Sequence, residues 1–159
     1  ADCPNGCSQP QIKDIGILGA CVPRVTAETC SRCEACLDAC RETAVALAED
    51  DDSGPVIDRE RCINCGRCIP VCPTETLATG QQVYRIQLGG KLGRHPRLAM
   101  ELPGIFSEDD VLRVISGCLA FYKQRSQRGE RFADLLTSND FEAYARQGRF
   151  PGADHTSPV

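Results

Sequence analysis

The sequence is poor in aromatic residues and has no tryptophan. Phe, Tyr and Trp make up 5% of the 159 residues, and there is a single methionine. A chain of this length is able to bury a core, but few large side chains are present to fill one. Twelve cysteines accompany this scarcity. The composition therefore indicates that inorganic centres supply part of the cohesion.

The chain also lacks an excess of basic residues and any long apolar run. Its net charge of −4 argues against a nucleic-acid partner, because proteins of that kind carry basic patches. No stretch of about 18 apolar residues is present, so we predict no membrane span. No basic segment followed by an apolar one is visible, so we expect no secretory signal. Together with the cysteine spacings described next, this favours a reducing, cytoplasmic compartment.

The cysteines form two runs that repeat with a period of 32 residues. Residues 25–48 read VTAETCSRCEACLDACRETAVALA, and residues 57–80 read IDRERCINCGRCIPVCPTETLATG. Each run has the spacing C-x2-C-x2-C-x3-C, followed by Arg41 in the first copy and by Pro73 in the second. In bacterial iron–sulfur runs of this spacing, the first three thiolates hold one cluster and the fourth serves the other.

Applied to both copies, this rule predicts two [4Fe–4S] clusters with crossed ligands. Structural zinc uses two well-separated ligand pairs, and a disulfide network gives no reason for two identical runs. Residues 25–80 thus resemble a bacterial-type ferredoxin. The expected ligands are Cys30, Cys33, Cys36 and Cys72 for cluster 1, and Cys62, Cys65, Cys68 and Cys40 for cluster 2.

An acidic run at 50–52, followed by a Ser-Gly-Pro sequence, separates the two cysteine runs. This composition is typical of a turn. One interpretation is a solvated hairpin tip, and the other is a docking patch for a basic electron-transfer partner. We expect short strands at 44–48 and 56–58 on either side of it.

The segments that flank the two cysteine runs predict strands of a different domain. Residues 12–22 are apolar and β-branched, residues 82–90 alternate in polarity, and residues 97–103 form a shorter candidate. We expect 15–22 and 83–88 to lie in one sheet, with the cysteine-rich module projecting from its edge. The predicted fold class is therefore α+β: a ferredoxin-like two-cluster module inserted into the sheet of a second domain, with C-terminal helices.

The C-terminal third predicts helices. Ser107 and Asp110 form a capping-box pattern, with Asp in place of Glu. Apolar residues recur at helical spacing after it, and the tail at 151–159 is expected to be loose. Cys118 lies on the apolar stripe and Cys21 in the first expected strand, so we interpret both as buried core thiols. Helices are expected at 111–122, within 129–136 and within 139–147.

One cysteine pair, Cys3 and Cys7 in the opening sequence ADCPNGCSQP, has no place in these runs. The stretches CPNGCSQPQIKDIGILG and YRIQLGGKLGRHPRLAMELPGIFSEDDVL, with the two-cluster module between them, resemble the C-terminal part of sirohaem-dependent sulfite and nitrite reductases. The resemblance points to the anaerobic and dissimilatory sulfite reductases, which carry such an insert. It implies that 1–24 and 81–150 are part of a nitrite/sulfite reductase domain, around an insert at 25–80.

The resemblance also implies a third [4Fe–4S] cluster. In this family a C-x5-C pair and a later C-x3-C pair ligate that cluster, and the last cysteine bridges it to the sirohaem iron. Cys3 and Cys7 are then half of a site, with Cys7 as the axial bridge. The chain is accordingly expected to be a fragment whose upstream half supplies the C-x5-C pair. A disulfide, or two free cysteines in a loop, is the alternative for the isolated chain.

The loop GGKLGRHPR is the second feature that the resemblance places near sirohaem. Arg grips carboxylates in bidentate fashion, so its cations suit the carboxylates of that macrocycle, while its glycines admit the ring. A glycine hairpin with solvated basic residues is the alternative. The expected cofactor-binding residues are Cys3, Cys7, Gly89, Gly90, Lys91, Arg94 and Arg97, with His95 as a further positive group and no catalytic residue assigned.

Three functions compete on this basis. In the first, the parent protein is an oxidoreductase that receives electrons from a donor protein. The two clusters then feed a sirohaem–[4Fe–4S] centre for six-electron reduction of sulfite or nitrite. The second is a stand-alone ferredoxin-like electron carrier, and the third is a non-catalytic cluster-bearing subunit. The C-x3-C pair and the glycine loop favour the first, the missing C-x5-C pair favours the others, and the fragment alone is expected to be inactive.

Overall fold

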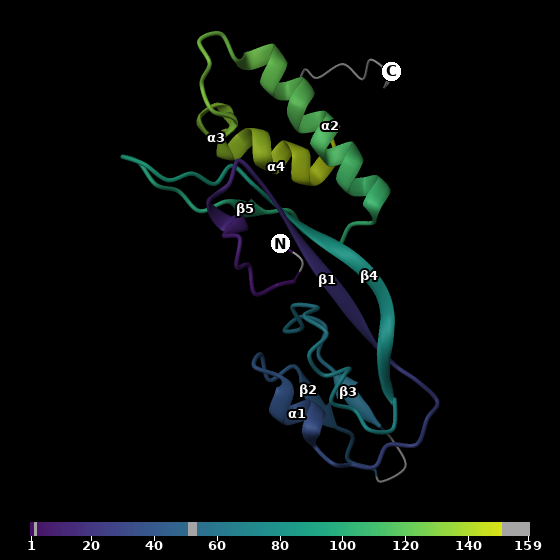
Figure 1. The fold of residues 1–159 in the computed structure, drawn as a ribbon. Coiled ribbons are helices and arrows are strands. Elements are labelled where there is room, and N and C mark those ends of the chain that lie inside the picture. The colour runs from purple at the N-terminus through teal and green to yellow at the C-terminus, as the bar shows by residue number, and fades with distance from the viewer. Residues whose placement is uncertain (2, 51–53, 151–159) are drawn as a thin grey trace. The chain divides into compact units, whose positions relative to one another are not determined.

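The structure, a computed structural model, describes residues 1, 3–50 and 54–150. These residues form a mixed α/β fold with a three-stranded and a two-stranded sheet (Figure 1). In chain order the elements are η1 (Pro10–Ile12), β1 (Ile15–Val25), α1 (Ala35–Ala39), β2 (Val45–Leu47), β3 (Pro55–Ile57), β4 (Leu77–Leu88), β5 (Met100–Glu101), α2 (Glu108–Arg125), α3 (Phe132–Leu135) and α4 (Ser138–Gln147).

Two compact units divide these elements. Unit 1 comprises residues 1–18 together with those from 84 onward, and unit 2 comprises residues 19–83. Unit 2 is therefore one continuous segment, entered along β1 and left along β4, and it contains both cysteine runs. The limits of unit 2 reflect how the backbone packs and do not test the insert boundaries at 25–80 that the cysteine motif predicts. Those boundaries stay a prediction.

The three-stranded sheet has the order β1-β4-β5. Strands β1 and β4 are hydrogen-bonded neighbours, which confirms the expectation that 15–22 and 83–88 share one sheet. Strand β5 pairs antiparallel with β4, with Gln87 opposite Glu101. In unit 2, β2 and β3 form an antiparallel hairpin with Val45 opposite Ile57, where two short strands were expected.

Helix α2 contributes an apolar stripe to the core of unit 1. This stripe packs with Ile86 and Leu88 of β4, which are 1% and 0% exposed. The scarce aromatic residues gather at its centre. The ring centroid of Phe121 lies 4.5 Å from that of Phe150 and 5.9 Å from that of Phe132. The buried stripe consists of Val111, Val114, Cys118 and Phe121.

Cys118 is a core thiol, as the sequence predicts. Its side chain is 0% exposed, and burial raises the pKa of its thiol to about 12. A thiol with such a pKa stays protonated at neutral pH, and the thiolate is the form that binds metal. Cys118 therefore acts as a small apolar residue of the core.

The capping box predicted at the start of α2 is present. The Ser107 amide donates to Asp110 Oδ2 over 3.0 Å, and the Asp110 amide donates to Ser107 Oγ over 3.2 Å. The Ser107 hydroxyl donates to the same carboxylate over 2.6 Å. The two hydrogen bonds that Ser107 donates to this carboxylate, the hydroxyl bond first, and a further one from Arg113 lower the pKa of Asp110 from 3.8 to about 2.

We expect Ser107→Ala to destabilise the protein by about 1 kcal/mol at neutral pH, the usual effect of losing an N-cap. A carboxyl group with a depressed folded-state pKa contributes stability that is complete above its unfolded pKa and is lost as the pH falls through the folded value. The difference in the free energy of unfolding between Ser107→Ala and the wild type should therefore shrink between pH 4 and pH 2. Urea unfolding at several pH values measures it. Ser116→Ala, at an exposed position of the same helix, is the control; an equal loss there would contradict the assignment.

The observed elements differ from the sequence predictions mainly at their ends. The first strand begins at residue 15 rather than 12, because Pro10 opens the short η1 turn just before it. The strand expected at 97–103 is reduced to the two residues of β5, and Phe106 beyond it forms an isolated antiparallel bridge with Tyr84 of β4. Thr137 and Asp140 form a second capping box that starts α4. Asp51 and Asp52 of the acidic run at 50–52, with Ser53 after them, and the tail at 151–159 lie outside the described residues.

Candidate metal centre

The two cysteine runs adopt the same backbone conformation. Three residues with a left-handed backbone occur at equivalent places in each run. The first two pairs lie between the first three cysteines, and the last pair follows the fourth cysteine. The pairs are Arg32 and Asn64 (φ 53° and 55°), Glu34 and Gly66 (φ 60° and 70°), and Thr43 and Glu75 (φ 48° and 54°). Residues other than glycine rarely adopt this conformation, so its recurrence shows that the two loops are the same structure.

The turn that carries the fourth cysteine also repeats. In the first run, the Cys40 amide donates to the Leu37 carbonyl over 3.0 Å. In the second, the Cys72 amide donates to the Ile69 carbonyl over 3.1 Å. Helix α1 forms this turn in the first run. The position of the fourth cysteine in each run is thus set by this local turn. The first three cysteines lie on the preceding loop.

Each run's fourth cysteine neighbours the other run. Burial raises the pKa of Cys68 to about 11, and the nearby charges of Cys65, Cys62 and Cys40 add to the rise. Three of these four thiols belong to the second run, and Cys40 belongs to the first. The exchange also occurs in the other direction. Burial raises the pKa of Cys36, and the charges of Cys72 and Cys30 contribute.

An apolar cluster surrounds these thiols. Cys36 and Cys68 are each 7% exposed and pack with Val45 and Leu77. Such a setting excludes water, and solvent exposure is one of the factors that set the reduction potential of a cluster. Cys33 is exposed, while Cys30, Cys62 and Cys65 are half-buried. The partly buried members of the cluster are Leu37, Cys40, Ile57, Ile69 and Cys72.

Backbone amides point at several of the sulfur atoms. The Arg32 amide donates to Cys30 Sγ over 3.4 Å, and the Ala44 amide donates to Cys40 Sγ over 3.3 Å. Burial acts to raise the pKa of Cys72, but the Leu77 amide, 3.4 Å from its sulfur, and the Thr74 hydroxyl outweigh burial and lower it. Donors aimed at sulfur stabilise the thiolate, which is the ligand form.

These features suit iron–sulfur clusters better than a single metal ion. Within the part of the chain that the structure describes, no three His, Cys, Asp or Glu side chains are arranged around one ion. In a cubane each thiolate binds a different iron atom, so its ligands stand further apart than the ligands of zinc. Apolar surroundings, amide donors and two matching loops of three cysteines define an iron–sulfur protein.

The segment after Cys3 and Cys7 lies against the glycine loop. Both of these cysteines are exposed. The Gly90 amide donates to the Lys13 carbonyl over 2.9 Å, and a Cβ at Gly90 would lie 2.6 Å from the Gln11 carbonyl oxygen. The close approach that this glycine permits is therefore to the backbone of Gln11–Lys13. The glycine loop therefore contacts the segment that follows the cysteine pair, and a shared sirohaem site for the two stays a prediction.

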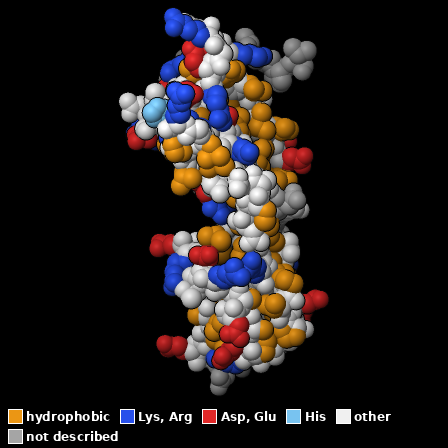
Figure 2. Space-filling model, turned by 60° about the vertical axis from the view of Figure 1, so that its left-hand side comes forward, with side chains coloured by type: hydrophobic (Ala, Val, Ile, Leu, Met, Phe, Trp, Pro, Cys, Tyr) orange, Lys and Arg blue, Asp and Glu red, His pale blue; other side chains and the backbone are white. Residues whose placement is uncertain are grey.

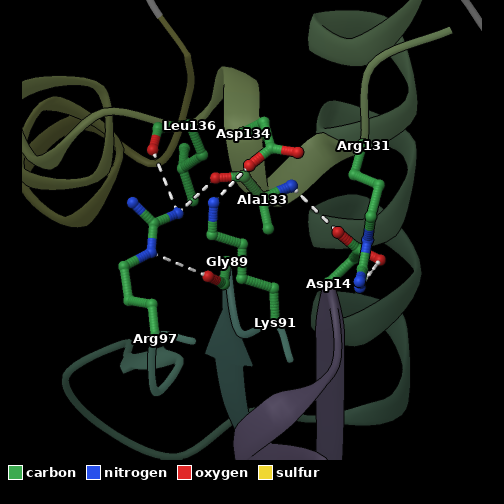
Figure 3. Close-up of polar contacts among 8 residues, drawn as sticks. All are labelled: Asp14, Gly89, Lys91, Arg97, Arg131, Ala133, Asp134 and Leu136. Carbon is green, nitrogen blue, oxygen red and sulfur yellow. Dashed lines mark hydrogen bonds and ion pairs between the residues drawn. The ribbon is translucent and has the colours of Figure 1, made fainter. Parts of the chain in front are cut away.

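Arg97, expected to bind a carboxylate, is engaged inside the chain (Figure 3). Its Nε donates to the Gly89 carbonyl over 3.1 Å. Its Nη2 donates to the carbonyl of Ala133 and, over 3.4 Å, to that of Leu136. The guanidinium thus fixes the start of the glycine loop to the α3 segment. Its contact with a cofactor stays a prediction.

Two ion pairs reinforce the same junction (Figure 3). Lys91 binds Asp134, and this hydrogen bond lowers the pKa of that carboxyl. Asp14 accepts from Arg131 over 2.7 Å and from the Ala133 amide over 2.9 Å. Sequence reasoning missed these acidic partners, because Asp14 and Arg131 stand 117 positions apart and no local pattern links them. Among the cations of the loop, Arg94 is exposed, as is His95.

We expect Arg97→Lys to destabilise the protein by about 1–3 kcal/mol, because it leaves partly buried carbonyl groups without their donor. A lysine has a single ammonium group and lacks the planar fork that reaches three carbonyls at once. Thermal unfolding measures the loss. Arg94→Lys on the same loop is the control, with an expected change within about 0.5 kcal/mol. Equal effects of the two variants would argue against the clamp.

Cys21 is half-buried, and the prediction of a buried core thiol was wrong for this residue. Its backbone forms a parallel bridge with Cys65, and its amide donates to the Asn64 carbonyl over 2.7 Å. The strand pattern correctly placed Cys21 in β1. It gave no sign that this part of the strand meets the second cysteine loop instead of a packed core.

Comparison with known proteins agrees with this geometry. The family described as the nitrite and sulphite reductase 4Fe-4S domain matches residues 1–147. The match extends over both units, and the chain belongs to this family.

Several individual proteins are similar to the chain. It is 31% identical over 129 residues to a coenzyme F420-dependent sulfite reductase of Methanocaldococcus jannaschii, covering 81% of the chain and 20% of that protein. It is 32% identical over 124 residues to a subunit of the anaerobic sulfite reductase of Salmonella typhimurium, covering 77% of the chain and 37% of that protein. A ferredoxin of Sorangium cellulosum, Fdx2, is 36% identical over 50 residues, covering 31% of the chain and 42% of that protein.

The fold resembles a solved structure. The crystal structure of dissimilatory sulfite reductase I matches with a TM-score of 0.60 and 18% identity, covering 99% of this chain and 43% of that one. The chain therefore spans less than half of the length of this structure and of both sulfite reductase relatives.

The surface shows no extended area of one charge on the face drawn in Figure 2, where acidic, basic and apolar side chains are interspersed. Among the described residues, no helix combines the length and the apolar character that crossing a membrane requires.

Proposed function

We propose that residues 25–80 hold two [4Fe–4S] clusters with crossed ligands and pass electrons to a sirohaem-linked centre that reduces sulfite or nitrite. The observation that carries this proposal is the exchange of cysteines between the runs: Cys40 neighbours Cys68, and Cys72 neighbours Cys36. The continuous unit 2, which contains both runs, supports a module inserted into a larger domain.

In this proposal the chain's own residues hold and tune the clusters. Cys30, Cys33, Cys36 and Cys72 bind one cluster, and Cys62, Cys65, Cys68 and Cys40 bind the other. The apolar cluster around Cys36 and Cys68 keeps water from the sulfur atoms, and the amides of Arg32, Ala44 and Leu77 donate to ligand sulfurs. Hydrogen bonds to sulfur and solvent exposure both act on the reduction potential.

The proposal gives this chain only part of the sirohaem site. Cys3 and Cys7 supply two exposed thiols, whereas a cubane takes four ligands. Lys91 and Arg97 are engaged by Asp134 and by backbone carbonyls. The proposal therefore includes an upstream half that supplies the remaining ligands, an electron-donor protein, and a reducing, cytoplasmic location. When bound, sirohaem would supply the iron on which the substrate is reduced.

A stand-alone electron carrier is the second candidate, and the similarity to Fdx2 favours it over the cluster region. A carrier needs only the cysteine-rich module. Unit 1, with its own aromatic core and the Arg97 junction, has no purpose in that case. A non-catalytic subunit is a third possibility that uses both units, and the similarity to one subunit of an anaerobic sulfite reductase is compatible with it. Reductase activity of the assembled protein separates the first proposal from these two.

The direct test is the iron and acid-labile sulfide content of the anaerobically purified chain. We expect about eight irons and about eight sulfides per chain, as two [4Fe–4S] clusters require, and a signal of interacting clusters in the electron paramagnetic resonance spectrum of the reduced protein. The Cys118→Ala variant should keep the same iron content, since that thiol lies in the core of unit 1. Zinc in place of iron would overturn the proposal.

A further inference from the structure

Cys21, which belongs to neither cysteine run, lies beside the second run within unit 2. Cys21 of β1 and Cys65 form a parallel backbone bridge. Paired strands run about 4.7–4.9 Å apart, and the Cα atoms of disulfide-linked cysteines are usually about 4.4–6.8 Å apart. The two backbones therefore already stand at the spacing that a disulfide requires.

The side chain of Cys21 lies against the loop that contains Cys65. A Cβ added at Gly66 would be 3.1 Å from the Cβ of Cys21 and 3.5 Å from its sulfur. Gly66, with a φ of +70°, thus leaves room for this thiol. Cys21 and Cys65 are both half-buried, so a small oxidant has access to the pair.

We propose that Cys21 and Cys65 form a disulfide when cluster 2 is lost to oxidation, and that this bond withholds Cys65 from iron until it is reduced. The inference rests on the proposed function, in which Cys65 is a ligand of cluster 2. The device is specific to that cluster. Cys33, the counterpart of Cys65 in the first run, has no such bridge to a cysteine among the described residues.

The chemistry balances with hydrogen peroxide as the two-electron oxidant. A thiolate of the pair attacks the peroxide, becomes a sulfenic acid and releases hydroxide. The second thiolate attacks that sulfur, forms the S–S bond and expels another hydroxide. The two hydroxides take up the two thiol protons, so two thiols and one peroxide give one disulfide and two waters.

The sequence allows the bond to be mapped directly. Trypsin cuts after Lys13 and Arg24, and it cuts after Arg61 and Arg67. Residues 14–24 then contain Cys21 as their single cysteine, and residues 62–67 contain Cys62 and Cys65. The full chain is treated anaerobically with limited hydrogen peroxide, blocked with iodoacetamide, digested without reductant and analysed by mass spectrometry. Fragmentation of the linked peptide tells Cys65 from Cys62.

We expect the linked peptide 14–24/62–67, joined through Cys65, to be the main oxidised form of Cys65 and to disappear after reduction. Cys21→Ser should abolish it and leave Cys65 blocked by iodoacetamide; Cys21→Ala is a second variant in case serine disturbs the strand. The inference is overturned if Cys21 is recovered alkylated while Cys65 is joined to Cys40, Cys62 or Cys68. The iron content, measured before peroxide is added, tests the proposed function separately. A chain that contains zinc or no iron contradicts the proposed function, whatever the peptide map shows about the disulfide.

Discussion

Replacing Cys40 and Cys62 together with serine is expected to leave about four irons per chain, one intact [4Fe–4S] cluster. Although the two cysteines come from different runs, the crossed arrangement assigns both to cluster 2. The structure supports this choice because Cys40 contributes, with Cys62 and Cys65, to the raised pKa of Cys68. Cluster 1 keeps all four of its ligands in this variant. Iron and sulfide analysis of the anaerobically purified protein gives the count.

The matched control removes the same number of thiols from a single run. Cys30→Ser with Cys40→Ser takes one ligand from each crossed cluster, so both should be damaged and the iron content should fall well below about four. The reciprocal pair is Cys72→Ser with Cys30→Ser, which should spare cluster 2. If the single-run variant keeps one intact cluster and the mixed variant keeps neither, each run binds its own cluster and the crossing is wrong.

The second large effect concerns Cys3 and Cys7. Supplying a polypeptide of the same family that carries a C-x5-C pair, together with sirohaem, should raise the iron content from about eight to about twelve, excluding the sirohaem iron. A visible sirohaem band should appear with it. The physical reason is that two exposed thiols hold a cubane poorly, whereas four from the joined halves complete its coordination. The chain alone should show neither the additional irons nor the band.

Cys7→Ser in the assembled protein should then lose reductase activity and the sirohaem band while the clusters of the insert stay at about eight irons. Retention of these clusters shows that the fold survives the substitution. Cys118→Ala, which changes a cysteine buried in the core, is the control and should keep the full iron content if it folds. About twelve irons in the unassisted chain would contradict the half-site, and full activity of Cys7→Ser would contradict the bridging role.

The sequence predicted those features whose cause is local. The capping box of α2 was predictable because Ser107 and Asp110 are three positions apart and satisfy each other's backbone amides. The cysteine loops were predictable for the same reason, since each turn is set by contacts within a few residues. The pairing of β1 with β4 followed from the apolar, β-branched character of the first segment and the alternating polarity of the second, which both indicate strands with a face to bury. Strand limits were less certain, because Pro10 and its turn shift the start of β1.

Contacts between distant segments were decided by the tertiary structure alone. A guanidinium group has no sequence signal that separates a cofactor ligand from a clamp, and only the fold places the carbonyls of Gly89, Ala133 and Leu136 around Arg97. Likewise, an apolar strand pattern indicates burial, but it does not say that Cys21 meets Cys65. The spacing of the cysteines in the sequence by itself determined the kind of centre, because the geometry of a short loop depends on contacts within that loop. Which thiols and cations are free for that chemistry depends on the packing of residues far apart in the chain.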